Sequence, residues 1–131
     1  MLNKVVLIAL PGVAPFEFGV ICEVFGIDRS DSGGPTFDFS IATAEPGRVP
    51  TSLGFDMVID QDLSVATDAD LIAVPAHHIR GFGDEATDER VLQAVRDAQA
   101  RGAWVLSVCS GAFVLAEAGI LDGRKATTHW M

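Results

Sequence analysis

The sequence predicts an α/β fold, a three-layer sandwich around a mostly parallel sheet. Short apolar runs bounded by turn residues alternate with segments of helical periodicity, and such runs are typical of strands buried on both faces. The length of 131 residues and an apolar fraction of 49% suffice for one domain with a core. In such sheets ligands bind outside the carboxyl ends of the strands, so we expect the functional residues at that edge.

The first 44 residues predict a strand, a helix and a second strand. Residues 4–10 form a continuous apolar run that ends at a Pro-Gly pair. Residues 15–25 begin with proline and carry Glu17 in the first turn, both of which suit a helix start, and Gly26 follows as a candidate C-cap. Few polar residues interrupt this helix, so we expect it to be mostly buried. Residues 37–44 alternate between apolar and polar side chains, which predicts a strand.

The remainder of the chain continues this alternation. Further strands are expected at residues 49–51, 55–59, 70–75, 103–108 and 124–128. Helices are expected at residues 87–101, where Thr87 is the predicted N-cap, and at residues 110–118. The order of strands and helices predicts a flavodoxin-like sheet, with residues 45–63 as a small extension.

Composition excludes several classes of protein. Nine basic and eighteen acidic residues give a net charge of −9, so these residues alone are not expected to bind nucleic acid. The longest apolar run, residues 5–10, is too short to cross a membrane, and no signal peptide is recognisable, which predicts a cytoplasmic protein.

Cys22 and Cys109 show no CxxC spacing, and no G-x-G-x-x-G or P-loop occurs, so neither a metal nor a nucleotide cofactor is indicated. Cys22 lies in an apolar helix and is interpreted as a core residue.

The sharpest local feature is Cys109, at the junction of a predicted strand and a predicted helix. Its neighbours Ser107, Ser110, Gly111 and Ala112 are small, as the tight turn of a nucleophile elbow requires. The N–H groups of Ser110 and Gly111 would open the helix and favour a thiolate. The position before the elbow is serine rather than the glycine of G-x-S-x-G. The alternative interpretation is a buried core cysteine.

Four other side chains are expected near the same edge. Glu17 follows the first strand and can donate a proton to a thiolate at Cys109 if burial raises its pKa; alternatively it is an ordinary first-turn glutamate. His77 and His78 follow the strand at 70–75 and either line a pocket or meet solvent. His129 follows the last predicted strand and either approaches Cys109 as an acid or base or is an ordinary histidine. No third group completes a triad.

These residues resemble a known family. The stretch of residues 107–130, which ends in Thr-Thr-His-Trp, closely resembles the cysteine-elbow region of the ThiJ/PfpI superfamily of class I glutamine amidotransferase-like domains. The closer likeness is to the branch that forms the N-terminal half of many AraC-family transcriptional regulators, and it extends to residues 12–19, 22–26 and 48–58.

The resemblance implies Cys109 as the elbow cysteine, Glu17 as its acidic neighbour and His129 as the nearby histidine. The family's domain continues past the Thr-Thr-His-Trp motif, so residues 1–131 are expected to be a ThiJ/PfpI-like domain that is incomplete at its C-terminus. The regulators also carry a helix-turn-helix domain, which this chain lacks, and DNA would be bound only through that domain.

The leading hypothesis is a ligand-sensing and dimerisation domain of an AraC-type regulator, a homodimer that binds a small metabolite near the elbow cysteine. Ser110, Gly111, His77 and His78 are the expected ligand contacts. The alternative is a cysteine-dependent hydrolase, hydratase or amidase that uses Cys109; isonitrile hydratases of the superfamily pair the cysteine with an aspartate where this chain has Glu17. A third hypothesis is a redox sensor in which Cys109 is oxidised to a sulfinate.

Overall fold

The computed structural model describes residues 1–77 and 86–128 as a parallel sheet with helices on both faces. The strands are β1 (Lys4–Ile8), β2 (Asp38–Ala42), β3 (Gly47–Pro50), β4 (Asp56–Ile59), β5 (Leu71–Val74) and β6 (Trp104–Ser107). The helices are α1 (Pro15–Phe25), α2 (Glu89–Ala100) and α3 (Ala112–Glu117), with short 3₁₀ turns η1 (Ser30–Ser32), η2 (Leu63–Ala66) and η3 (Cys109–Gly111). In the described parts of the chain, no helix has the length and apolar character needed to cross a bilayer.

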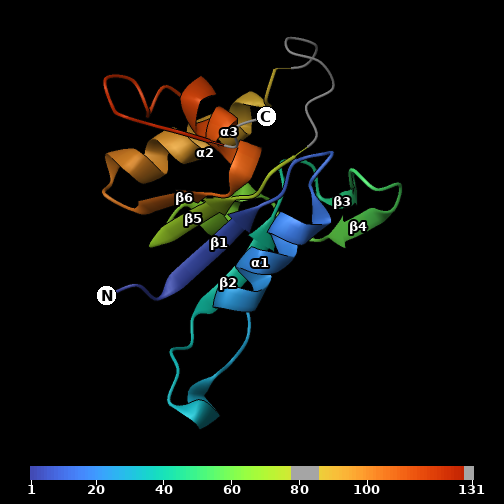
Figure 1. The fold of residues 1–131 in the computed structure, drawn as a ribbon, viewed down its shortest axis with the longest axis vertical. Coiled ribbons are helices and arrows are strands. Elements are labelled where there is room, and N and C mark those ends of the chain that lie inside the picture. Colours follow the sequence, from blue (N-terminus) through green and yellow to red (C-terminus); the bar gives the residue numbers. More distant parts are fainter. Residues whose placement is uncertain (78–85, 129–131) are drawn as a thin grey trace.

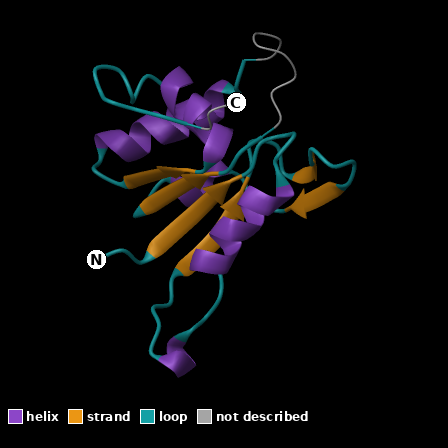
Figure 2. Cartoon of the chain, viewed as in Figure 1, coloured by secondary structure: helices purple, strands orange, loops and turns teal. Residues whose placement is uncertain are grey.

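The main sheet has the order β2-β1-β5-β6, and all neighbouring strands in it are parallel. Strands β3 and β4 form a separate antiparallel hairpin. Figure 1 shows α1 on one side of the sheet and α2 and α3 on the other, and Figure 2 shows the strand arrows of the main sheet pointing the same way. The predicted three-layer α/β sandwich with a flavodoxin-like sheet is therefore confirmed.

The core lies on both faces of this sheet because side chains alternate along each strand. In β1, Val6 and Ile8 pack in the cluster that contains the apolar stripe of α2, such as Val95. Val5 and Leu7 of the same strand pack in the other cluster, with Ile21 of α1. Double burial explains why the strand is a continuous apolar run rather than an alternating one.

Helix α1 differs from the sequence expectation of a mostly buried helix. Ile21 is its one buried residue, whereas Phe16 is 78% exposed and Val20 and Val24 are also exposed. A helix that packs on a sheet buries only the stripe that faces the sheet, and no other described segment covers the outer side. The outer face of α1 is therefore apolar and accessible.

The start of α2 also differs from the prediction. Asp88 rather than Thr87 is the N-cap, and its carboxylate accepts a hydrogen bond from the Arg90 N–H at 2.9 Å. Thr87 instead donates its backbone N–H and its hydroxyl to the Glu117 carboxylate, at 3.0 and 2.6 Å. Both residue types can cap a helix, and the contact with Glu117 draws Thr87 away from that role.

The strand expected at residues 124–128 is not present. The backbone of 125–128 has no regular structure and pairs with no strand of the described residues. A strand forms only where a neighbour supplies hydrogen bonds along its length, and within the described residues the segment 125–128 makes a single hydrogen bond. The Thr128 hydroxyl donates to the carbonyl of Cys109 at 2.7 Å, which holds this segment against the end of β6.

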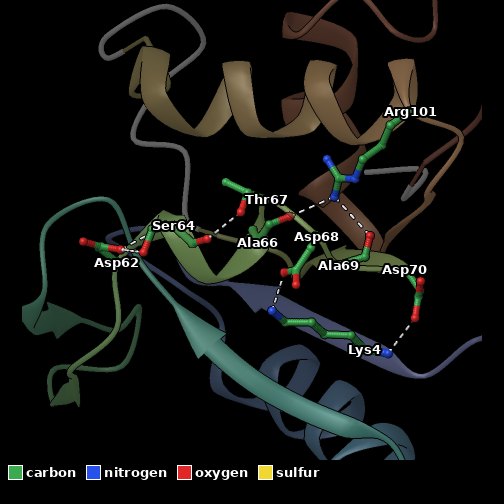
Figure 3. A network of polar contacts seen from close by, with 9 residues as sticks. All are labelled: Lys4, Asp62, Ser64, Ala66, Thr67, Asp68, Ala69, Asp70 and Arg101. Atoms are coloured by element: carbon green, nitrogen blue, oxygen red, sulfur yellow. Dashed lines mark hydrogen bonds and ion pairs between the residues drawn. The ribbon is translucent and has the colours of Figure 1, made fainter.

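The amino edge of the sheet is fastened by a polar network (Figure 3). After α2, Arg101 donates through Nη2 to the carbonyls of Ala66 and Ala69, at 2.8 and 3.0 Å. The Asp70 carboxylate accepts the Lys4 N–H at 2.8 Å, which lowers the pKa of Asp70 and joins the starts of β5 and β1. These contacts stabilise the end of the sheet opposite the expected functional edge.

Candidate functional site

The chain makes a strained turn at Cys109, between β6 and the helical turns η3 and α3. The φ angle of Cys109 is 53°, and it is the one non-glycine residue with positive φ among the described residues. Such a left-handed conformation costs a side-chain-bearing residue roughly 1–2 kcal/mol and persists only where surrounding structure imposes it. Cys109 as a whole is half-buried, intermediate between a core residue and a solvent-facing one.

Gly111 shows what imposes this turn. A Cβ atom at Gly111 would lie 2.3 Å from the carbonyl oxygen of Val74 and 3.0 Å from that of Pro75. The backbone of η3 therefore packs directly on the end of β5, a distance that only glycine permits. The Val108 N–H donates to the same Val74 carbonyl at 3.1 Å, so both sides of the turn are fixed to one strand.

The hydrogen bonds of the turn differ in part from the sequence expectation. The Gly111 N–H donates to the Val108 carbonyl at 3.0 Å, so it is engaged within the turn rather than directed at the sulfur. The Ser110 hydroxyl donates to the carbonyl of His77 at 3.3 Å. The Cys109 turn and the segment after β5 are thus directly joined.

His77 lies at the centre of this edge. Its backbone forms an isolated bridge with Val13 of the β1–α1 loop. Its Nδ1 atom is buried and has no hydrogen-bond partner among the described residues. Burial lowers the pKa of the His77 imidazole, and the nearby Glu117 carboxylate partly opposes that shift, so the ring is neutral at pH 7. His78 lies outside the described residues.

Glu17 is placed in the first turn of α1 and is half-buried. The loop before it is anchored on both sides, because the Gly12 N–H donates to the Pro50 carbonyl and the Ala14 N–H donates to the Ala76 carbonyl, each at 2.8 Å. The loops after β1 and β5 are therefore side by side, as the shared edge of a parallel sheet requires. No hydrogen bond between Glu17 and Cys109 occurs in the described part of the structure.

His129 lies outside the described residues. Its neighbour in sequence, Thr128, holds the end of the described chain against Cys109 through the hydroxyl-to-carbonyl bond at 2.7 Å. Within residues 1–77 and 86–128, no group of three or more His, Cys, Asp or Glu side chains is arranged to hold a metal ion.

A cavity of about 850 Å³ opens at the carboxyl ends of β1 and β2, and we call it the carboxyl-edge cavity. It is lined by residues 9–12, residues 43–45, residues 48–52 of the β3–β4 hairpin, His77, residues 86–88 and residue 91 of α2. Its volume is in the range of small-molecule sites. His77 belongs to its wall, whereas Cys109 and Glu17 do not.

Sequence reasoning missed this cavity as a feature separate from the elbow. One signal was accessible in principle, since Thr43 is a polar residue at the end of a strand that is otherwise apolar on its inner positions. In the structure Thr43 is 2% exposed and donates its hydroxyl to the Ala9 carbonyl at 2.9 Å. The contribution of the hairpin to the wall has no local sequence signature.

Comparison with protein families gives a match over nearly the whole chain. The model of the DJ-1/PfpI family matches residues 3–131. A Streptomyces lividans protein encoded in the cpoL 5′ region is 32% identical over 98% of this chain and 88% of its own length.

Two relatives of known type match over shorter stretches. The isonitrile hydratase of Pseudomonas putida is 44% identical over 61 residues, which cover 47% of this chain and 26% of the hydratase. The HTH-type transcriptional regulator CdhR of Pseudomonas aeruginosa is 34% identical over 95 residues, which cover 72% of this chain and 27% of the regulator. The matched regions thus span about a quarter of each relative.

Solved structures share the fold. The crystal structure of an AraC family transcriptional regulator from Pseudomonas putida aligns with a TM-score of 0.76 and 22% identity, over 98% of this chain and 67% of that one. Drosophila melanogaster DJ-1beta aligns with a TM-score of 0.71 and 23% identity, over 91% of this chain and 61% of its own. At these identities the likeness establishes the fold alone.

Proposed function

Since the chain belongs to the DJ-1/PfpI family, we propose that it is the ligand-sensing and dimerisation domain of an AraC-type transcriptional regulator in the cytoplasm. The observation that carries this proposal is the similarity to the regulator CdhR, which covers more of the chain than the similarity to the hydratase does. The ligand is a small metabolite bound beside the elbow cysteine at the carboxyl edge. The cavity of about 850 Å³ at that edge has the predicted contact His77 in its wall, though not Cys109, and it supports a ligand site at this edge.

The negative charge of the chain suits a protein in which ligand sensing and DNA binding belong to separate domains. A net charge of −9 opposes contact with phosphate, so DNA binding belongs to a helix-turn-helix domain outside residues 1–131. In that arrangement this domain binds the metabolite and sets the spacing of the DNA-binding domains by forming a homodimer. The exposed apolar residues of α1, Phe16 and Val24, supply a surface for that contact.

The test has two parts. Thermal-shift screening of the chain against metabolites is expected to give stabilisation by at least one small polar compound. That compound is then added to the full-length protein bound to its promoter DNA, and the affinity is expected to change. A chain that no compound stabilises, or a bound compound that leaves DNA affinity unaltered, contradicts the regulator proposal.

The second candidate function is a cysteine-dependent hydrolase, hydratase or amidase. The strained φ of 53° at Cys109 favours it, because strained backbone is concentrated at active sites. In this alternative Cys109 is the nucleophile, Glu17 hydrogen-bonds the thiolate and His129 assists in proton transfer. Assay of the chain with isonitriles and simple amides, beside the Cys109→Ser variant, tests it: turnover that the variant retains in full excludes Cys109 as the nucleophile.

A further inference from the structure

Thr128, the last described residue of the chain, is joined to the Cys109 turn by one hydrogen bond. Its hydroxyl donates to the Cys109 carbonyl at 2.7 Å, the ordinary length of a well-formed bond between two oxygens, although the two residues are 19 positions apart in the sequence. Residues 125–128 have no regular structure that this bond would support. Because the bond ends on the strained residue of the turn, it indicates a role for Thr128 in holding that turn.

The bond fixes the peptide unit between Cys109 and Ser110. No cis peptide bond occurs among the described residues, so the carbonyl of Cys109 and the N–H of Ser110 point in opposite directions. The same carbonyl also accepts the backbone N–H of Ala112 within the helical turn η3. Since the carbonyl is held by Thr128 on one side of the peptide unit, the Ser110 N–H is held on the other.

The Ser110 N–H is the donor that the turn leaves available. The Gly111 N–H donates to the Val108 carbonyl at 3.0 Å, and the Ser110 hydroxyl donates to the His77 carbonyl at 3.3 Å. In the described part of the chain, the backbone N–H of Ser110 donates to no backbone carbonyl. In a nucleophile elbow, the N–H of the residue after the nucleophile stabilises negative charge that develops at the site.

The hydroxyl of Thr128 affects this donor in two ways. It fixes the direction of the Ser110 N–H through the rigid peptide unit. It also strengthens that donor, because hydrogen bonds that share a peptide unit polarise one another. The recorded contact of Thr128 is with the Cys109 carbonyl rather than with the sulfur, so any effect on the thiol passes through the peptide unit.

We propose that Thr128 is a positioning residue of the Cys109 turn, which orients the Ser110 N–H so that it stabilises the Cys109 thiolate. The inference rests on the second candidate function for the use of that thiolate as a nucleophile. It adds a residue from the segment after α3, outside the elbow itself. The reactivity of the thiol is measured without substrate or ligand, so the inference is tested separately from any turnover.

Alkylation of the chain with iodoacetamide tests the proposal. The thiolate displaces iodide, so a carbon–sulfur bond forms as the carbon–iodine bond breaks, and the rate depends on the fraction of thiol that is ionised. Thr128→Val keeps the size of the side chain but removes the hydroxyl, and it is expected to slow alkylation of Cys109 about threefold at pH 7. At about pH 10, where even an ordinary thiol is ionised, the variant is expected to react at least as fast as the parent.

Two further variants and an internal reference make the test specific. Thr128→Ser keeps the hydroxyl and is expected to restore the rate of the parent. Thr127→Val is the matched control, because Thr127 is the neighbouring threonine and is also exposed, and it is expected to react as the parent does. Peptide mass spectrometry separates Cys109 from Cys22, which lies in α1 and is expected to react at the same rate in every variant.

NMR of the ¹⁵N-labelled chain supplies a signature of the peptide unit itself. The amide signal of Ser110 is expected to move in Thr128→Val, because its peptide unit loses the partner of the carbonyl, and to stay in place in Thr127→Val. An unmoved Ser110 signal in Thr128→Val overturns the proposal, since the hydroxyl would then not act on this peptide unit.

Three outcomes of the alkylation experiment also overturn it: equal rates of the parent and Thr128→Val at pH 7, a slowing of equal size at both pH values, or a slowing that Thr128→Ser does not reverse. The second of these would show that Thr128 controls access to the thiol rather than its ionisation. The enzyme proposal fails independently. If alkylation of Cys109 depends on Thr128 but neither isonitriles nor amides are turned over, the assignment of Thr128 stands and the second candidate function does not.

Discussion

Gly111→Ala is the substitution for which the structure predicts the largest effect. Gly111 has helical backbone angles, φ −56° and ψ −24°, so alanine is acceptable there on conformational grounds. The difficulty is steric, because the new Cβ would lie 2.3 Å from the Val74 carbonyl oxygen. That contact is about 1 Å shorter than an ordinary van der Waals contact, and the obstacle is the backbone of a central strand rather than a side chain that can rotate.

The magnitude follows from two contributions. Overpacking of a rigid site costs about 1–3 kcal/mol. Displacement of the turn also weakens the 3.1 Å hydrogen bond from Val108 to Val74, worth about 1 kcal/mol. We expect Gly111→Ala to lower the free energy of unfolding by about 3 kcal/mol, against a total of about 5–15 kcal/mol for a typical domain. The corresponding fall in Tm is roughly 10 °C for a chain of this size.

Gly19→Ala is the matched control. Gly19 lies within α1, and a Cβ there would meet nothing within 4 Å. The same chemical change is therefore expected to stabilise the protein, by about 0.5–1 kcal/mol, because alanine is the better helix former. Urea unfolding followed by circular dichroism measures both variants. If Gly111→Ala is as stable as the parent, the close packing of the Cys109 turn on β5 is wrong.

Three further predictions concern the same edge and the helix beside it. Cys109→Gly is expected to be more stable than Cys109→Ala by about 1 kcal/mol in urea unfolding, since both lose the sulfur but only glycine relieves the positive φ; equal stabilities would show that the turn is not left-handed. Burial lowers the pKa of His77 in the folded state below its value of 6.5 in the unfolded chain. The neutral, buried His77 therefore contributes its full stabilisation above pH 6.5, and this stabilisation is lost as the pH falls from 6.5 toward the pKa of the folded state. The free energy of unfolding measured between pH 7.5 and 5 (roughly the range in which histidine titrates) is expected to decline, and His77→Gln to flatten that decline; an unchanged slope in the variant argues against a buried imidazole. Asp88→Ala removes the N-cap of α2 and is expected to lower the free energy of unfolding by about 1 kcal/mol. Thr87→Val leaves that cap in place and tests whether Thr87 is the cap instead. A larger loss of stability in the Thr87 variant than in the Asp88 variant would reverse the assignment.

The elements that depend on local pattern could be predicted well. The run at residues 4–10 and the helix at 15–25 appear as β1 and α1, because burial on two faces and an N-terminal proline act within a few residues. The exposure of Phe16 could not be predicted in this way. Hydrophobicity records that a side chain prefers burial, but whether another layer exists to bury it depends on the whole arrangement. The absence of a strand at 124–128 has the same origin, since a strand requires a partner as well as a sequence.

The sequence was sufficient to predict the edge of the sheet at which the site lies, but not the cavity at that edge. That Cys109, Glu17 and His77 follow strands of one parallel sheet was enough to place them near its carboxyl edge. Their division between a thiol turn and a separate cavity depends on pairings between loops, above all the bridges from Val13 to both Thr51 and His77. Those bridges bring the hairpin against the end of β1 and leave space between the hairpin and α2. A one-residue change in the length of any of these loops would alter the wall of the cavity while leaving every local pattern intact, so the strands determine where the cavity lies and the loops determine its shape.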